Sequence, residues 1–389
     1  MEPIIKWPGG KSNEVNYVEE IMPKEFDRYI EPFFGGGAVF FHLEPKKAII
    51  NDVCKELIDF YKFIKGDLDR GEFEKELMDY AKKWNKINHY NGKFENFLLK
   101  LYDKFKLNLI AEKEMETEIL AFFSDQNELF NGLFSKDFCV DRERLETELK
   151  KGIISKLKRI KKIDPNNKFT KIEMKNHIET GFRSGFYMHF RNIMNDSKFD
   201  KINISDSKKI ANYYFIREFC YGSMFRFNKK GVFNIPYGGI NYNKKNFEEK
   251  INRVLSPKVK NIFQNTIIEN LDFEDFFKKY QFKENDFIFL DPPYDTEFSG
   301  YEETPFTKKD QERLAKCLYN LKAKFILIIK NTDFILNLYQ NKHNIKMDSF
   351  DKTYTYNVRG RNIRDVQHLI IHNLSNTQKK LIEKWVQTV

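Results

Sequence analysis

The clearest chemical group in the sequence is Asp291-Pro292-Pro293-Tyr294, which directly follows the apolar run at 286–290. The run predicts a buried strand, and open α/β sheets bind their ligands at the carboxyl ends of such strands. Two prolines stiffen the backbone there, so the Asp291 carboxylate and the Pro292 carbonyl form a rigid pair of acceptors. Such a pair can accept both N–H groups of an exocyclic amine, and the Tyr294 ring offers a flat face to a planar base. The group therefore indicates chemistry on a nucleobase amine.

A glycine-rich turn near the N-terminus predicts a second ligand site. Gly35, Gly36 and Gly37 stand between a strand pattern and a helix pattern, where a ligand can approach the backbone closely. Asp52 follows the next apolar run, and a carboxylate at a strand end can accept two hydrogen bonds from ribose hydroxyls. The turn lacks the full G-x-G-x-x-G pattern because position 40 is phenylalanine. These residues indicate a nucleoside cofactor without specifying which one.

Gly10-Lys11-Ser12 resembles the end of a phosphate-binding P-loop. That motif needs another glycine five residues before Gly10, where this chain has Ile5, and it needs a preceding strand for which too few residues exist. An NTPase is therefore rejected. The segment is either a structural turn or part of the cofactor site.

Positive charge is concentrated in the middle of the chain. The 389 residues carry 67 Lys and Arg against 57 Asp and Glu, a net charge of +10. Residues 151–254 contain 23 basic and nine acidic side chains, so this segment carries +14 and the remainder carries −4. A solvated face and a polyanion-binding surface both produce such an excess. Within the segment, residues 223–239 predict an aromatic-rich hairpin around a turn at 228–231.

The order of the expected elements indicates one domain inserted into another. Strand and helix patterns alternate in residues 1–60, and a helical pattern fills residues 61–150. The segment 163–264, rich in Asn, Tyr and Gly, predicts loops with short strands. Strand patterns return at residues 261–269, 286–290, 324–329 and 367–372, with a helix pattern at 308–321. We expect an α/β catalytic domain from residues 1–60 plus 255–389, and an inserted domain at residues 61–254.

The composition argues against several other classes. No run of 18 apolar residues is present, the N-terminus has no apolar signal region, and the four cysteines are widely spaced without a C-x-x-C pair. We expect a cytoplasmic protein with reduced thiols, no metal site and no membrane segment.

Together these motifs resemble the Dam-type DNA adenine N6-methyltransferases, also called the D12 class. The matches occur in the family's order at Trp7–Lys11, Glu31–Val39, Asn51–Asp52, Arg226–Gly238, Asp291–Tyr294 and Pro305–Leu314. The resemblance implies a Rossmann-like, S-adenosylmethionine-dependent methyltransferase sheet with a largely helical DNA-recognition domain that contains a β-hairpin. Two departures stand out: the insert from residue 61 to about 215 is longer than in compact members, and the acidic residue usual near His368 is absent.

The resemblance also implies roles for individual residues. Those assigned to S-adenosylmethionine are Trp7, Lys11, Phe33, Gly35, Gly37, Asp52, Asp272, Phe273 and Asp291, with Asp272 and Phe273 as an adenine clamp. Those assigned to catalysis are Asp291, Pro292, Pro293 and Tyr294. The implied reaction is direct methyl transfer to N6 of an adenine flipped out of double-stranded DNA. In the hairpin, Arg226 and Asn228 suit base edges, whereas Lys229 and Lys230 suit phosphates.

Other functions stay open at this point. The catalytic group alone also fits N4 of cytosine or an adenine in RNA, although the motif order favours adenine in duplex DNA. An inactive DNA-binding subunit is disfavoured by the intact Asp291–Tyr294 group, and a nucleotide-binding oxidoreductase by the incomplete glycine pattern. The DNA site, the oligomeric state and the existence of a cognate restriction endonuclease are not specified by the sequence.

Overall fold

The computed structural model describes residues 1–8, 15–125, 135–166, 168–293, 306–354 and 364–374. The chain divides into two compact units, which are Met1–Leu68 with Pro257–Val389, here called the sheet unit, and Asp69–Ser256, here called the helical unit. The boundary expected between residues 60 and 61 cuts through helix α3 (Lys55–Lys65). This helix belongs to the sheet unit, where the Tyr61 ring lies 5.5 Å from that of Phe263.

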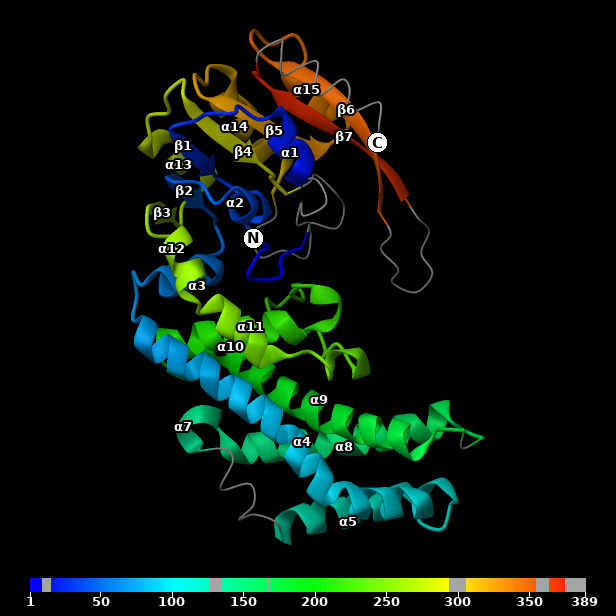
Figure 1. The fold of residues 1–389 in the computed structure, drawn as a ribbon. Coiled ribbons are helices and arrows are strands. Elements are labelled where there is room, and N and C mark those ends of the chain that lie inside the picture. The colour runs from blue at the N-terminus through cyan, green and yellow to red at the C-terminus, as the bar shows by residue number, and fades with distance from the viewer. Residues whose placement is uncertain (9–14, 126–134, 167, 294–305, 355–363, 375–389) are drawn as a thin grey trace. The chain divides into compact units, whose positions relative to one another are not determined.

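The sheet unit is built on a seven-stranded sheet with the order β3-β2-β1-β4-β5-β7-β6 (Figure 1). The strands are β1 (Arg28–Glu31), β2 (Ala48–Asn51), β3 (Thr266–Glu269), β4 (Asp286–Leu290), β5 (Lys324–Lys330), β6 (Lys346–Tyr354) and β7 (Arg364–His372). The first five strands run parallel, and the register places Ile30 beside Ile49 and Ile288. β7 runs antiparallel to β5 and β6. This sheet confirms the expected Rossmann-like methyltransferase fold.

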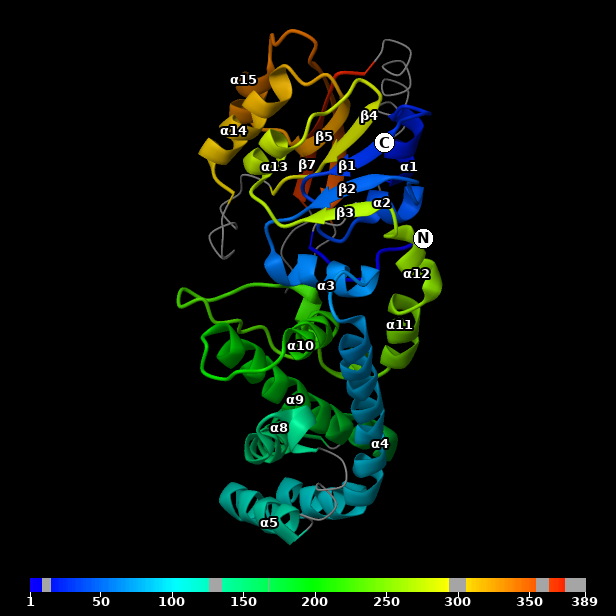
Figure 2. The same ribbon diagram turned by 90° about the vertical axis from the view of Figure 1, so that its left-hand side faces the viewer.

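Helices cover both faces of the sheet. Figure 2 shows α13, α14 and α15 on one face and α1, α2 and α12 on the other. Their bounds are α1 (Val15–Ile21), α2 (Ala38–Leu43), α12 (Pro257–Ile262), α13 (Phe273–Lys279), α14 (Lys308–Tyr319) and α15 (Asp333–Tyr339). A strand covered on both faces can bury every side chain. This explains the short, uniformly apolar runs of the sequence, because β2 and β4 are buried along their whole length.

Two details of the sheet differ from expectation. The strand expected at 261–269 begins only at Thr266, because α12 continues to Ile262. The edge strand β6 was not predicted. Its sequence, KMDSFDKTY, is mostly polar and pairs only with β7, so it lacks the apolar signal of a central strand.

The helical unit consists mainly of long helices. They are α4 (Arg70–Lys106), α5 (Glu112–Asp125), α7 (Lys136–Cys139), α8 (Arg142–Ile163), α9 (Lys171–Lys198), α10 (Asp206–Phe219) and α11 (Phe247–Val254), with 3₁₀ turns η1 (Tyr221–Ser223) and η2 (Ile240–Tyr242). The prediction of loops over 163–264 is therefore wrong for much of that segment. α9 begins at a capping box formed by Thr170 and Glu173, and it buries Ile178, Phe182 and Phe186 on one face.

Glycines allow α8 and α9 to pack closely. A Cβ atom on Gly185 would lie 2.4 Å from the carbonyl oxygen of Glu148, and one on Gly152 would lie 2.4 Å from that of Gly181. Residues without a Cβ atom are therefore required at this crossing. The glycines that suggested loops in the sequence serve here as a contact between helices.

In each unit, the two ends of the chain that lead to the other unit lie side by side. In the sheet unit, α3 packs against α12. In the helical unit, the Arg70 guanidinium donates a hydrogen bond of 2.7 Å to the carbonyl of Leu255. None of the helices within the described ranges is long and apolar enough to cross a membrane.

Candidate active site and nucleic-acid interface

The parallel strands bring four predicted site segments to one edge of the sheet. The glycine-rich turn follows β1, Asp52 follows β2, Asp272 follows β3 and Asp291 follows β4. These four strands are neighbours and point the same way, so their carboxyl ends share an edge. The structure thus gathers residues that lie up to 256 positions apart between Gly35 and Asp291.

Trp7 packs against the glycine-rich turn. Gly35 has a φ of 49°, and a Cβ atom there would lie 2.7 Å from Cδ1 of the Trp7 ring. Gly37 has a φ of 65° and faces the Phe34 ring in the same way, at 2.5 Å. Side chains are therefore excluded at both glycines by the backbone conformation and by an aromatic neighbour. The Tyr61 hydroxyl donates to the Gly35 carbonyl at 3.0 Å and holds the turn from α3.

Asp52 is fixed onto this turn. Its Oδ2 accepts a hydrogen bond of 2.8 Å from the backbone N–H of Gly35, and its Oδ1 accepts one of 2.9 Å from that of Cys54. Burial raises the pKa of Asp52, against the opposing effect of backbone N–H groups of Cys54, Gly35 and Val53. A carboxylate has about four acceptor positions, so the group can still accept a hydrogen bond from a ligand's hydroxyl.

Asn51 joins the ends of three strands. Its amide nitrogen donates to the carbonyls of Pro32 and Leu271 at 3.0 and 3.1 Å, and its amide oxygen accepts from the backbone N–H of Leu271 at 2.9 Å. One buried side chain thereby sets the spacing between the turn after β1 and the loop after β3.

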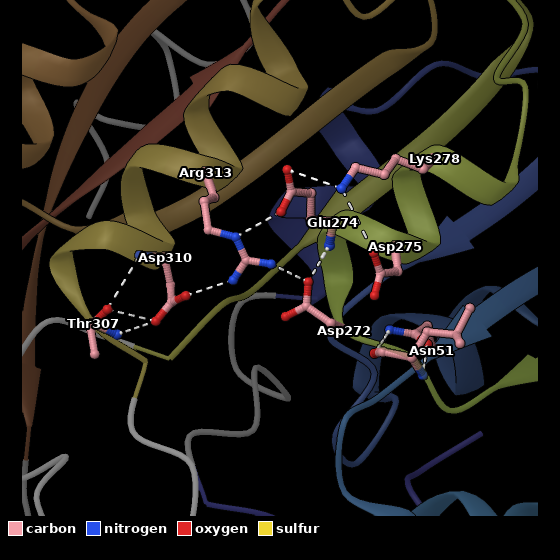
Figure 3. A network of polar contacts seen from close by, with 9 residues as sticks. Asn51, Asp272, Glu274, Asp275, Lys278, Thr307, Asp310 and Arg313 are labelled. Atoms are coloured by element: carbon pink, nitrogen blue, oxygen red, sulfur yellow. Dashed lines mark hydrogen bonds and ion pairs between the residues drawn. The ribbon is translucent and has the colours of Figure 1, made fainter.

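Asp272 begins α13 and lies in a network of charges (Figure 3). Its Oδ1 accepts a hydrogen bond of 2.9 Å from the backbone N–H of Glu274 and a second one from the Arg313 guanidinium. Arg313 also donates to Glu274 at 2.8 Å and to Asp310 at 2.7 Å. The Arg313 hydrogen bond lowers the pKa of Glu274. This network, which ties α14 to α13, was not foreseen from the sequence.

An aromatic cluster adjoins the network. The rings of Phe33, Phe273 and Phe306 lie between 5.5 and 5.7 Å apart in all three pairs. The Arg313 guanidinium of α14 lies 4.7 Å from the centre of the Phe273 ring, at the start of α13. Phe33 comes from the glycine-rich turn, so the cluster connects the predicted adenine clamp to that turn.

The turn after β4, which is predicted to be catalytic, is described as far as Pro293. Asp291 is half-buried, Pro292 is buried and Pro293 is exposed. The Gln311 amide donates a hydrogen bond of 3.1 Å to the Pro293 carbonyl, so the start of α14 also holds this turn. The predicted site residues Lys11 and Tyr294 lie outside the described residues.

Glu31 is a buried acid at the site that sequence reasoning did not assign. It is 3% exposed and accepts a hydrogen bond of 2.7 Å from the Tyr29 hydroxyl. Burial raises the pKa of Glu31 well above its ordinary value; the Tyr29 bond opposes this rise, and the negative charges of Asp291 and Asp52 add to it. The sequence feature that could have indicated Glu31 is its position at the end of an apolar strand pattern.

Glu31→Gln should make stability less dependent on pH. Because the native pKa of Glu31 is raised, its contribution is fully present below the ordinary glutamate pKa of about 4.3 and is lost as pH rises toward the native value. Glutamine can accept the same Tyr29 hydrogen bond without ionising. Chemical unfolding between about pH 5 and pH 9 should show the variant gaining on the wild type as pH rises, by at most about 1.4 kcal/mol per pH unit. A difference that stays constant with pH would contradict the assignment.

The predicted DNA-contacting residues lie on the helical unit. The arms of the hairpin pair antiparallel at Phe227 with Phe233, as an isolated bridge rather than a continuous ladder. Arg226, Lys229 and Lys230 are exposed. Asn228 is exposed too, but its side-chain oxygen accepts hydrogen bonds from the backbone N–H groups of Lys230 and Val232, at 2.9 and 3.1 Å. That oxygen therefore shapes the turn.

Helix α9 supports the hairpin. The buried Asn195 side chain donates to the Phe233 carbonyl at 3.0 Å and accepts from its N–H at 2.9 Å, as a neighbouring strand would. Lys198 donates to the Gly231 carbonyl at 3.1 Å and lies 4.0 Å from the centre of the Phe227 ring. These contacts hold the backbone of the turn in a defined position against the helix.

Comparison with known proteins identifies the family. The model of the D12 class N6 adenine-specific DNA methyltransferases matches residues 7–133 and 147–355, which is most of the chain. The chain belongs to this family. The matched residues of this D12 methyltransferase include every predicted site residue, from Trp7 to Tyr294. The family confirms the expected enzyme class, methylation of adenine in DNA, and excludes the oxidoreductase alternative.

Two relatives align with most of this D12 chain, and a third aligns with about a third of it. The Type II methyltransferase M.CviBI of Paramecium bursaria Chlorella virus NC1A is 25% identical over 378 residues, which cover 96% of this chain and 100% of that protein. The Type II methyltransferase M.MjaIII of Methanocaldococcus jannaschii is 29% identical over 364 residues, 89% of this chain and 90% of that protein. The retron Ec67 DNA adenine methylase of Escherichia coli is 35% identical over 141 residues, 36% of this chain and 47% of that protein.

Proposed function

We propose that the carboxyl edge of the sheet binds S-adenosylmethionine and an adenine flipped out of double-stranded DNA, and that Asp291 and Pro292 assist methyl transfer to N6. The observation that carries the proposal is the convergence of four segments at this edge. The glycine-rich turn follows β1, and the fixed Asp52 carboxylate follows β2. Asp272, beside the aromatic cluster, follows β3, and the Asp-Pro-Pro turn follows β4.

The residues present fit this cofactor. Asp52 offers a remaining acceptor position to the ribose hydroxyls. The Asp272 side chain is 39% exposed and offers an acceptor to the adenine base, beside the buried Phe273 ring. Trp7 borders the turn that would hold the methionine portion, and by resemblance Lys11 would meet its carboxylate. When bound, S-adenosylmethionine supplies an electrophilic methyl group on its sulfonium sulfur.

Asp291 and Pro292 would act on the target amine. The N6 amine is a poor nucleophile because its lone pair is delocalised into the adenine ring. Two acceptors for its N–H groups favour a tetrahedral nitrogen and stabilise the positive charge that develops during transfer. Burial and the negative charges of Asp291 and Asp52 raise the pKa of Glu31, which ends the neighbouring strand β1. By resemblance, Tyr294 would stack on the flipped base.

The hairpin on the helical unit is the proposed DNA reader. Arg226 has a side chain able to form two hydrogen bonds to a guanine edge, whereas Lys229 and Lys230 suit phosphates. The exposure of all three residues supports this assignment. For Asn228, the amide nitrogen is the group left to meet a base edge, because the amide oxygen holds the turn.

Removing the two lysines should weaken binding to all DNA sequences alike. Each phosphate contact releases about one condensed counterion, so Lys229→Ala combined with Lys230→Ala should reduce the slope of log affinity against log salt by about two units. Binding titrations of specific and unrelated duplexes at several salt concentrations measure this. Lys113→Ala, which removes an exposed lysine from α5, is the control. An unchanged slope would show that the turn does not touch phosphate. A change in the preferred DNA sequence is expected for Arg226→Ala and not for the lysine variant.

Incubation with tritium-labelled S-adenosylmethionine and unmethylated genomic DNA tests the proposal. Digestion to nucleosides should place the label on N6-methyl-2′-deoxyadenosine. Label on N4-methylcytosine, or on RNA added in parallel, would overturn the proposed substrate. Sequencing the modified positions gives the recognition site. The Type II names of two relatives extend the proposal to a cytoplasmic methyltransferase that acts beside a restriction endonuclease of the same site.

A further inference from the structure

We propose that Arg313 is a positioning residue that makes the cofactor pocket selective for an adenine base by fixing the carboxylate of Asp272. The inference rests on the proposed function, because it takes Asp272 and Phe273 as the residues that hold the cofactor's base. It gives a role to a residue of the family match at Pro305–Leu314, for which the sequence analysis assigned no role in cofactor binding.

The hydrogen bonds of Asp272 divide its two carboxylate oxygens between different tasks. Oδ1 accepts from the backbone N–H of Glu274 and from the Arg313 guanidinium. Among the described residues, none donates a hydrogen bond to Oδ2. With Oδ1 held from two directions, the plane of the carboxylate is set, and Oδ2 is presented as an acceptor. An acceptor in a fixed place selects a ligand that offers an N–H donor there.

Arg313 is itself held in place. Its Nε donates to Glu274 at 2.8 Å and one terminal nitrogen donates to Asp310 at 2.7 Å, so its planar fork is fixed by carboxylates from two helices (Figure 3). Asp310 in turn forms a capping box with Thr307 at the start of α14. The orientation of the Asp272 carboxylate thus depends on the first turn of α14.

The same guanidinium also restrains the aromatic part of the clamp. It lies 4.7 Å from the centre of the Phe273 ring, which packs 5.5 Å from Phe33. Three carboxylates surround the single positive charge of Arg313, so the local charge is negative. This field favours the donating 6-amino group of adenine with or without Arg313, so the contribution of Arg313 to selectivity is the fixed geometry of the Asp272 carboxylate and not its charge.

Binding of two nucleoside analogues to the full-length protein tests the inference. The probes are S-adenosylhomocysteine and S-inosylhomocysteine, which differ at the 6-position of the base. Calorimetry on the wild type should give tighter binding of the adenine compound by roughly 10- to 100-fold, as expected for a hydrogen bond to a charged group. Arg313→Gln should reduce this ratio by about tenfold, mainly by weakening the adenine compound. Arg313→Lys, which keeps the charge and loses the planar fork, should behave like Arg313→Gln.

Arg28→Gln is the matched control. Arg28 also grips a carboxylate, that of Asp286, with hydrogen bonds of 2.9 and 2.5 Å, but at the opposite end of β1 and β4. This variant should reduce stability and leave the ratio of the two affinities unchanged. A double-mutant cycle of Arg313→Gln with Asp272→Asn should show that the two effects on the ratio are not additive.

The outcomes separate this inference from the proposed function. If the wild type prefers S-adenosylhomocysteine and Arg313→Gln keeps the same preference, the role of Arg313 is overturned. The cofactor assignment then stays intact. Equal binding of both analogues by the wild type would overturn the role of Asp272 and, with it, that of Arg313. Absence of binding to either analogue would overturn the cofactor assignment itself.

Discussion

Asp291→Ala is expected to slow methyl transfer by about 10³-fold while the protein stays folded and continues to bind DNA. Asp291 is half-buried at the end of β4, where its carboxylate would meet the target amine. Removing one preorganised group that stabilises charge in a transition state typically lowers kcat by about 10²- to 10³-fold. Here the loss should be at the upper end of that range, because the Pro292 carbonyl alone cannot satisfy both N–H groups of the amine.

Single-turnover transfer of the tritiated methyl group to a methylatable duplex measures the effect. Circular dichroism and a DNA-binding titration accompany it, since both should match the wild type. Asp27→Ala is the control, because Asp27 is an exposed aspartate just before β1, at the other end of the strand from the site. Full activity of Asp291→Ala would remove the residue from the mechanism.

Gly185→Ala should lower the free energy of unfolding by about 2 kcal/mol, although alanine is the better helix former. The added Cβ atom would lie 2.4 Å from the Glu148 carbonyl oxygen and 2.6 Å from the Leu149 Cα atom. Both are backbone atoms of α8, so no side chain can rotate away, and the two helices must separate. The expected result is a clear decrease in the thermal midpoint of the helical unit.

Gly92→Ala is expected to change the free energy of unfolding in the opposite direction. Gly92 is exposed within α4, and a Cβ atom there meets nothing within 4 Å. This substitution should raise the free energy of unfolding by up to about 1 kcal/mol, because only helix propensity changes. Denaturant titrations of both variants compare the two cases directly. A stabilised Gly185→Ala would mean that α8 and α9 do not cross at this position.

The residues at the strand ends could be predicted because their signal is local. Asp52 and Asp291 each follow a short apolar run, and parallel strands bring such positions to one edge without further information. The glycine-rich turn was visible for the same reason. The Rossmann-like fold and the enzyme class therefore followed from motifs within reach of a single strand, whereas the order of the strands came only from the structure.

Other features depend on partners that are distant in sequence. Arg313 is an ordinary helix residue until α14 packs beside α13 and brings it to Asp272, 41 positions away. Glu31 became notable only when burial and two acidic neighbours were known. The helices over 163–264 were missed because Asn, Tyr and Gly were interpreted as loop residues, although Asn195 and Gly185 serve tertiary contacts on a helix. The local amino-acid composition does not indicate these tertiary contacts.

Because the two chain ends lie side by side within each unit, we expect that another inserted segment could take the place of the helical unit. α3 and α12 meet in the sheet unit, and Arg70 meets Leu255 in the helical unit, so each part closes on itself where the chain crosses over. The sheet therefore sets no requirement on how long the inserted segment is or what it contains. We therefore expect that an insert of different length or sequence could replace it while the strand ends keep their geometry. On the proposed function, the recognised DNA sequence could then diversify independently of the chemistry.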